Sequence, residues 1–176
     1  MPLPDGYSDI PAGKIAAVVT HLEMTARPAA RDDPPGAWTL RKADAPPLHW
    51  YRDLHRRVGE EWLWLSRLRM NDAQLAAIIQ APGIEIYALV VDGRDEGLLE
   101  LDFRDPGQCE LVYFGVTAGL IGTGAARFLM NRALERVVWR CASRLGAHLH
   151  LRSSVGSRVL SALRLHPVPP PDRGGG

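Results

Sequence analysis

The residues best placed to do chemistry lie in a turn that is rich in small side chains, namely Ala118, Gly119, Gly122 and Gly124. The turn follows a run of β-forming residues at 111–116, and the apolar periodicity after it predicts a helix. A glycine turn that leads from a strand into a helix leaves several backbone N–H groups unpaired at the positive end of the helix dipole. Such a turn binds anions, and phosphate is its usual occupant.

The predicted helix has apolar residues at every third or fourth position: Ala126, Leu129, Met130, Ala133, Leu134 and Val137. The polar residues that we expect to face solvent are Arg127, Asn131, Arg132, Glu135 and Arg136. One apolar stripe of this kind packs a helix against a core.

Two common phosphate motifs do not fit this spacing. A dinucleotide fingerprint needs a third glycine three residues after Gly124, where the chain has Arg127. A P-loop needs Lys and then Ser or Thr after the glycine, where the chain has Ala125 and Ala126. We therefore expect a different class of phosphate compound.

Strands and helices upstream must position this turn. Residues 14–24 and 38–42 predict strands, with a Pro- and Asp-rich loop at 29–36 between them. From residue 84 the apolar period is two, and Asp92 with Gly93 predicts a hairpin turn. Beyond it, apolar and charged residues alternate: Leu99, Leu101 and Phe103 with Glu100, Asp102 and Arg104.

Residues 44–70 predict a helix, which Gly59 could divide in two. Its apolar stripe is Leu48, Tyr51, Leu54, His55, Val58, Trp62 and Leu65. Asn71 and Gln74 have the spacing of a capping box, which predicts a second helix that ends before Pro82.

The composition predicts one soluble domain. The chain has 176 residues, of which 46% are apolar, and a net charge of +1, so it is long enough to bury a core. Because no apolar run could span a bilayer and the first ten residues lack the features of a signal peptide, we expect a cytoplasmic protein with no membrane partner. We expect no nucleic-acid partner. We also expect no metal, since Cys109 and Cys141 are too few for a zinc motif.

The strand, turn and helix at 109–137 resemble motif A of the GNAT superfamily of acetyl-CoA-dependent N-acetyltransferases, in which Gln/Arg-x-x-Gly-x-Gly/Ala follows the fourth strand. Gly124 and Ala126 match this pattern, and Ile121 stands at the Gln/Arg position. The resemblance covers residues 36–140. It implies an α/β fold with a mixed, mostly antiparallel sheet flanked by helices, acetyl-CoA as co-substrate, and a small-molecule or peptide amine as acceptor. A homodimer is compatible with it.

The resemblance also implies site residues. The pyrophosphate would lie on the N–H groups of Ile121, Gly122, Thr123, Gly124, Ala125 and Ala126. The acetyl carbonyl and the pantetheine arm would contact the backbone at a bulge in the fourth strand, at the positions of Phe114, Gly115 and Val116. Gly115 suits a bulge because glycine tolerates unusual backbone angles.

An amine acceptor also needs a base. For a lysine-like group with a pKa near 10.4, exposing the free base at pH 7 costs about 4.6 kcal/mol. In the family the base often comes from the fourth strand, where Glu110 is the only carboxylate; Glu100 and Asp102 are alternatives on the neighbouring strand. A cluster of tryptophans, Trp50, Trp62 and Trp64, would either line the acceptor site or pack the core.

Two other functions fit the same residues. One is a catalytically inactive CoA-binding or interaction domain that keeps a GNAT-like fold. The other is a different nucleotide binder that uses the same turn.

The end of the chain departs from the family. We expect residues 1–35 to form an extension, 36–145 the GNAT-like domain, and 146–176 an atypical basic tail without a fifth strand and disordered towards its end. Arg far outnumbers Lys, which indicates a GC-rich gene. Codons exist for residues 147–171 that, read one base forward, encode HTCTFDHPSALVYYRRCGFTPFRRR, which resembles a GNAT ending. We therefore hypothesise a frameshift between Arg136 and Leu145, and expect the printed chain to bind CoA weakly with little turnover.

Overall fold

The computed structural model describes residues 9, 12–13, 20–24, 29, 31–141, 148–153 and 166–167. Its strands are β1 (Thr20–Met24), β2 (Trp38–Lys42), β3 (Ile84–Val91), β4 (Arg94–Asp102), β5 (Gln108–Val116), β6 (His148–Ser153) and β7 (His166–Pro167). Its helices are α1 (Leu48–Gly59), α2 (Asp72–Ile79) and α3 (Ala125–Cys141), with 3-10 turns η1 (Glu60–Trp62), η2 (Arg67–Arg69) and η3 (Ala118–Leu120).

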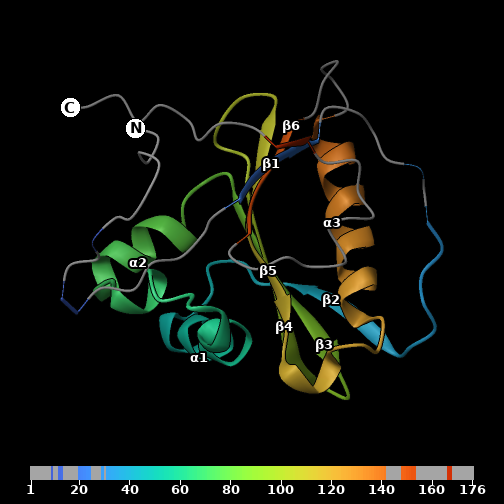
Figure 1. The fold of residues 1–176 in the computed structure, drawn as a ribbon, viewed down its shortest axis with the longest axis horizontal. Coiled ribbons are helices and arrows are strands. Elements are labelled where there is room, and N and C mark those ends of the chain that lie inside the picture. The colour runs from blue at the N-terminus through green and yellow to red at the C-terminus, as the bar shows by residue number, and fades with distance from the viewer. Residues whose placement is uncertain are drawn as a thin grey trace.

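The strands form one sheet in the order β2-β3-β4-β5-β6-β1-β7. Among the strands that the structure describes, only β5 and β6 pair in parallel, and the other pairs are antiparallel. Helices α1 and α2 lie on one side of the sheet and α3 lies on the other (Figure 1). The α/β fold with a mixed, mostly antiparallel sheet that the sequence predicts is confirmed.

Local sequence signals explain several elements. Strand β2 has the predicted bounds, and β3 and β4 are joined by Asp92 and Gly93, whose φ angles of 48° and 77° are those of a tight hairpin turn. Both hydrogen bonds of the predicted capping box join Asn71 and Gln74 at the start of α2.

The helix predicted for residues 44–70 is only partly present, and it ends at Gly59, the residue named as able to divide it. Helix α1 begins at Leu48 and ends at Gly59, and Leu63 has a left-handed φ of 59°. Glycine is required at the end of α1 because a Cβ on Gly59 would lie 2.3 Å from the ring of Trp64. The chain therefore folds back after Gly59, and η1 and η2 replace the expected second half of the helix.

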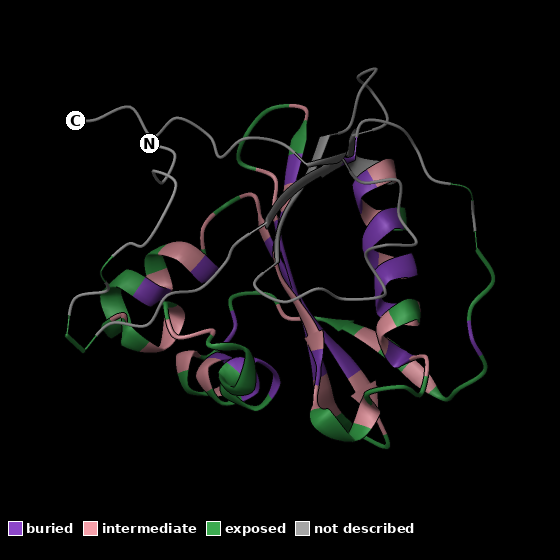
Figure 2. Cartoon of the chain, viewed as in Figure 1, coloured by how far each residue is buried: buried purple, intermediate pink, exposed green. Residues whose placement is uncertain are grey.

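Each face of the sheet carries its own apolar core. The predicted stripe of α3 packs on one face, where Leu129, Met130, Ala133, Leu134 and Val137 are buried, as the buried positions along α3 in Figure 2 show. On the other face α1 and α2 bury Tyr51, Leu54, Val58, Leu75 and Ile79 against β3 and β4. One expected solvent-facing residue of α3 is instead buried: the Asn131 amide donates to the Asp33 carboxylate over 2.8 Å.

The absence of a fifth strand after motif A, which the sequence led us to expect, is also wrong. Strand β6 lies parallel to β5 and pairs Gln108–Leu111 with His148–Leu151. Residues 14–19, where part of the first strand was predicted, and most of the tail predicted to be disordered lie outside the described residues. No helix in the described ranges combines the length and the apolar character needed to cross a membrane.

Candidate active site

The turn that the sequence predicts to bind phosphate, called the phosphate turn below, runs from Thr117 to Gly124, between the end of β5 and the start of α3. Gly122 and Gly124 have φ angles of 83° and 100°, a region that other residues rarely adopt. The Thr123 hydroxyl donates to the Leu120 carbonyl over 2.8 Å and accepts from the Ala125 N–H over 3.3 Å. The hydrogen bonds of the Thr123 side chain and the backbone angles of the two glycines therefore fix the conformation of the turn.

Several N–H groups of this turn remain open. Among the described residues, no partner accepts from the backbone N–H of Gly122, Gly124, Ala126 or Arg127. The first regular helical bond runs from Phe128 N–H to the Gly124 carbonyl, over 3.0 Å. Of the other residues predicted to hold a phosphate, Ile121 and Thr123 use their N–H groups inside the turn. The open donors lie at the positive end of a 17-residue helix.

A β-bulge interrupts β5, but three residues earlier than predicted. Glu100 of β4 pairs with Tyr113, whereas Leu101 pairs with Leu111, so Val112 is the extra residue. The bulge predicted at Gly115 is wrong, because Gly115 pairs regularly with Leu98.

Gly115 has a packing role instead. A Cβ there would lie 2.7 Å from the Val58 side chain of α1 and 3.2 Å from the ring of Trp64. Glycine thus allows α1 and the loop after it to approach β5.

The described pairing between β6 and β5 is confined to the part of β5 that precedes the bulge. Within the described chain, the backbone of residues 113–116 is therefore paired with β4 on one side and has no register with β6 on the other. Phe114, Gly115 and Val116, predicted to contact the acetyl and pantetheine groups, all lie in this stretch and lead directly into the phosphate turn.

The α1 side of the sheet carries a buried polar cluster, made of Tyr51, His55, Trp64, Arg67, Glu100 and Tyr113. The Glu100 side chain is 0% exposed, and it accepts hydrogen bonds from the Tyr51 hydroxyl and from Arg67, the latter over 2.6 Å. The Arg67 guanidinium lies over the Tyr113 ring, 5.5 Å from its centroid. The Tyr113 hydroxyl shares a 2.6 Å hydrogen bond with Ser66 at the exposed rim of the cluster.

His55 is the least satisfied member of this cluster. Its ring packs edge-on against Tyr113, 4.6 Å between centroids, and it is completely buried. Neither ring nitrogen has a hydrogen-bond partner. Burial, and then the charges of Arg67 and Arg56, lower the pKa of His55 to about 4, so the imidazole is neutral at pH 7.

The three carboxylates named from the sequence lie on the same face of the sheet but in different settings. Glu110 is half-buried and pairs in register with Asp102, at the end of β5 that precedes the bulge. Burial alone would raise the pKa of Asp102, but the hydrogen bonds from Arg104 outweigh it and hold the pKa below its usual value. Only Glu100 lies in the polar cluster.

Sequence reasoning missed the partners of Glu100. Arg67 was expected inside a long helix, and the single-residue shift at Val112 hides that Tyr113 shares a face with Glu100. One signal was present: Glu100 is a lone charge in the run Leu98–Leu101, which is otherwise apolar.

The three tryptophans do not gather. Trp64 packs against His55 and Tyr113, with ring centroids 5.7 and 5.0 Å away. Trp50 donates to Asp95 over 2.7 Å at the far end of α1, and Trp62 is 38% exposed. Only Trp64 therefore contributes to the cluster.

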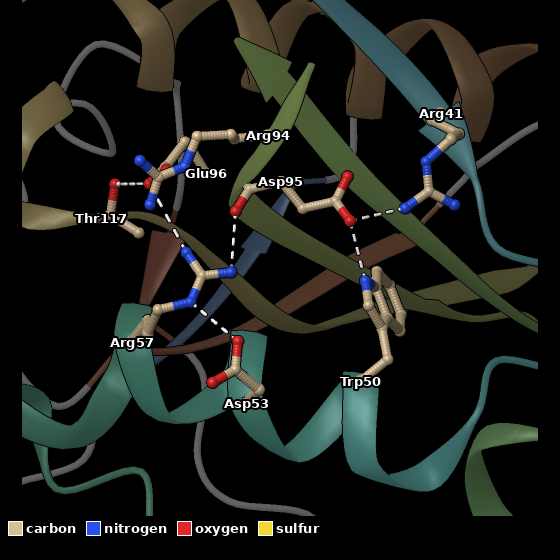
Figure 3. Close-up of polar contacts among 8 residues, drawn as sticks. All are labelled: Arg41, Trp50, Asp53, Arg57, Arg94, Asp95, Glu96 and Thr117. Atoms are coloured by element: carbon tan, nitrogen blue, oxygen red, sulfur yellow. Dashed lines mark hydrogen bonds and ion pairs between the residues drawn. The ribbon is translucent and has the colours of Figure 1, made fainter. Parts of the chain in front are cut away.

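A surface network fixes α1 relative to the phosphate turn (Figure 3). Arg57 of α1 donates to Asp53 and to the Asp95 carbonyl, both over 2.9 Å, and lies 3.5 Å from Glu96. Glu96 accepts from the Thr117 hydroxyl over 2.7 Å, where the turn begins. The helix beside the polar cluster and the open N–H groups are thus tied to the same hairpin.

Comparison with known proteins finds no matching family model and no matching curated protein. Solved structures do match. A tandem GNAT protein from the clavulanic acid biosynthesis pathway superposes with a TM-score of 0.60 at 15% identity, covering 94% of this chain and 58% of that chain. A GCN5-related N-acetyltransferase from Kribbella flavida gives 0.55 at 11% identity, covering 84% and 53%.

The aminoglycoside acetyltransferase AAC(6')-Iy, in complex with a bisubstrate analogue of CoA and monomethyl-acetylneamine, gives a TM-score of 0.53 at 21% identity, covering 73% of this chain and 90% of that chain. The chain therefore has the fold of the GNAT N-acetyltransferases, as the sequence predicts. It spans just over half the length of the tandem and Kribbella proteins.

Proposed function

We propose that this protein is an N-acetyltransferase that moves an acetyl group from acetyl-CoA directly to an amine. The observation that carries the proposal is the set of open N–H groups at the start of α3. The turn that presents them follows β5 directly, and beyond its bulge β5 has no described pairing with β6. The solved structures with this fold are named as acetyltransferases, and one was solved with a CoA bisubstrate analogue.

The phosphate turn suits the pyrophosphate of CoA. The N–H groups of Gly122, Gly124, Ala126 and Arg127 can donate to phosphate oxygens. The outer surface is open, since a Cβ built on Gly119 or Gly122 would meet nothing within 4 Å. The pantetheine arm would then follow the backbone of residues 114–116 towards the bulge.

The reaction needs positioning more than a reactive side chain. The amine nitrogen attacks the thioester carbonyl, a C–N bond forms and the C–S bond breaks. One proton leaves the nitrogen and one joins the departing thiolate, so no oxidant or metal is required. Fixed backbone donors can contribute several kcal/mol to such a transfer.

Glu110 remains our proposed base. Both oxygens of Glu100 are already used by Tyr51 and Arg67, and hydrogen bonds from Arg104 hold the pKa of Asp102 below its usual value. The acceptor would be a small-molecule or peptide amine, bound on the α1 side of the sheet.

Calorimetric titration with acetyl-CoA, CoA and NAD tests the binding half of the proposal, and release of CoA thiol with an amine panel tests the transfer. We expect acetyl-CoA and CoA to bind and NAD not to bind. Binding without thiol release would favour the inactive CoA-binding domain, and NAD binding would favour another nucleotide binder.

Thr123 offers a sharper test of the phosphate turn than Gly124. Any side chain at Gly124 would force a φ of 100° on an unsuited residue and bring its Cβ within 3.0 Å of Pro34. Thr123→Asp and Thr123→Asn can both accept from the Ala125 N–H, and they differ only in charge. We expect the Asp variant to bind CoA about tenfold more weakly than the Asn variant, or about 1.4 kcal/mol. Equal affinities would exclude a phosphate at this turn.

A further inference from the structure

The surroundings of Arg67 have the composition of a binding site for an organic cation. The charge of the guanidinium meets the fully buried carboxylate of Glu100 on one side and the face of the Tyr113 ring on another. Trp64 and Tyr51 complete the walls, since Trp64 packs on Tyr113 and Tyr51 donates to Glu100. A carboxylate beside aromatic faces is the arrangement that recognises ammonium and guanidinium groups.

Arg67 fills this site incompletely. It reaches Glu100 through a single nitrogen, over 2.6 Å, and its Nε is buried without a hydrogen-bond partner. A buried polar atom left unpaired is destabilising, so a ligand that satisfied the surrounding groups better could compete with Arg67.

The element that carries Arg67 is short. The guanidinium comes from η2, a turn of three residues, and the Arg67 side chain is 11% exposed. Between α1 and η2 the chain passes through Leu63, which has a φ of 59° that a branched side chain adopts at a cost, and Leu63 and Trp62 are 49% and 38% exposed. Trp64 and Met70, on either side of Arg67, pack against the α1-side core, so the movement that frees Glu100 is confined to the Arg67 side chain and the turn that carries it.

His55 supplies an independent sign that the site is incomplete. Its side chain is 0% exposed and both nitrogens lack partners. A neutral imidazole offers one lone pair to an N–H donor and adds no positive charge beside a cation. An ammonium group, with several N–H donors, can bond both Glu100 and a neutral histidine nitrogen.

We propose that Glu100, His55 and Tyr113 form a binding site for an organic ammonium or guanidinium group, and that Arg67 occupies this site as an internal substitute when no ligand is bound. Ligand binding displaces Arg67 from Glu100 towards the Ser66 rim. The inference rests on the proposed function in one respect, that the acceptor amine of that reaction is the ligand. The binding itself is measured without acetyl-CoA.

The test removes the internal substitute and supplies the cation from solution. In Arg67→Ala, ethylammonium chloride should raise the melting temperature by about 4 °C or more relative to the same concentration of sodium chloride. The double variant Arg67→Ala with Glu100→Gln keeps the space but loses the carboxylate, so it should show no difference between the two salts. Arg67→Lys, which carries its own ammonium, should also show none.

A purely structural ion pair gives different results. Equal responses of Arg67→Ala and the double variant to ethylammonium, or no response in Arg67→Ala, would overturn the inference. If Arg67→Ala does not fold in sodium chloride, recovery of its helical circular dichroism in ethylammonium supports the inference, and no recovery overturns it. Acetyl transfer by the wild-type protein tests the proposed function separately, because the salt titration requires no turnover.

Discussion

Two buried carboxylates, Glu85 and Glu100, lie on opposite faces of the sheet. Each accepts hydrogen bonds from a tyrosine and an arginine, but the two groups differ in how completely the hydrogen-bonding capacity of the side chains is used. On the α3 side, Glu85 accepts from the Tyr87 hydroxyl over 2.8 Å and from two nitrogens of Arg136, both over 2.6 Å. On the α1 side, Glu100 accepts from a tyrosine and from one nitrogen of an arginine. Both side chains are almost fully buried.

The difference lies in the element that supplies the arginine. Arg136 projects from a 17-residue helix whose apolar stripe fixes its position, and its bidentate geometry matches the carboxylate. Arg67 projects from a three-residue turn and leaves its own Nε and the neighbouring His55 unpaired. A closed Glu–Arg–Tyr group holds a helix on a sheet, whereas an open one leaves donors and acceptors that a ligand can use.

Removing Arg136 should have the largest effect on stability. Arg136→Ala leaves Glu85 buried without its charged partner, and we expect the free energy of unfolding to fall by about 3 kcal/mol. Urea denaturation measures this. The control is Arg94→Ala, which removes an exposed ion pair with Glu96 and should cost less than about 1 kcal/mol. Similar losses in both variants would contradict the closed character of the α3-side group.

The group around Glu100 on the α1 side should instead affect how the stability of the protein depends on pH, through His55. The folded-state pKa of His55 is about 4, below the value of 6.5 expected in the unfolded chain. The unfolded chain therefore binds more protons between these values, and stability falls as the pH drops through this window. From pH 7 to pH 5 the loss from this group is about 2 kcal/mol.

His55→Phe keeps an aromatic ring beside Tyr113 but cannot be protonated. We expect the stability difference between pH 7 and pH 5 to shrink by about 2 kcal/mol relative to wild type, as measured by urea denaturation at both pH values. An unchanged difference would show that His55 is not buried in its neutral form.

Glu110 belongs to neither group, which allows a smaller and more specific test. Glu110→Gln should lower turnover by about tenfold at low pH, where more of the acceptor is ammonium, and should leave acetyl-CoA affinity unchanged. The control is Asp102→Asn, the carboxylate in register with it. A wild-type pH profile in Glu110→Gln, or an equal loss in Asp102→Asn, would place the base elsewhere.

Short-range signals predicted much of the fold. The Asp92–Gly93 turn, the Asn71–Gln74 box and the apolar stripe of α3 each depend on residues close in sequence, and each is present in the structure. Gly59 was recognised as a possible break and α1 ends there, but the helical period could not indicate that Trp64 folds back over it.

The candidate site was predicted only in part. The glycine turn before α3 is a local feature, so its position could be predicted from its glycines and the helix after them, while phosphate binding there stays a prediction. The polar cluster depends on contacts over long sequence separations, such as the 49 residues between Tyr51 and Glu100 and the 33 between Arg67 and Glu100. No local pattern specifies these pairs.

The proposed frameshift stays a prediction. The strand HTCTFD of the shifted reading falls within one residue of the position of β6 (His148–Ser153). Sequencing the gene decides the question, because DNA whose shifted frame does not encode that ending would refute it. Strong acetyl transfer by the printed chain would overturn the expected loss of function.

The extra residue at Val112 reverses the parity of β5. Before it, odd-numbered residues such as Cys109 and Leu111 face α3; after it, the even-numbered Phe114 and Val116 do. Deleting Val112 would place Tyr113 directly after Leu111 and restore the ordinary alternation, so both halves of β5 would keep their faces. Tyr113 would still face α1 and Phe114 would still face the α3 core, and only the bulge would be lost. A single codon therefore determines whether β5 is bulged, without changing which of its other side chains the acceptor would meet.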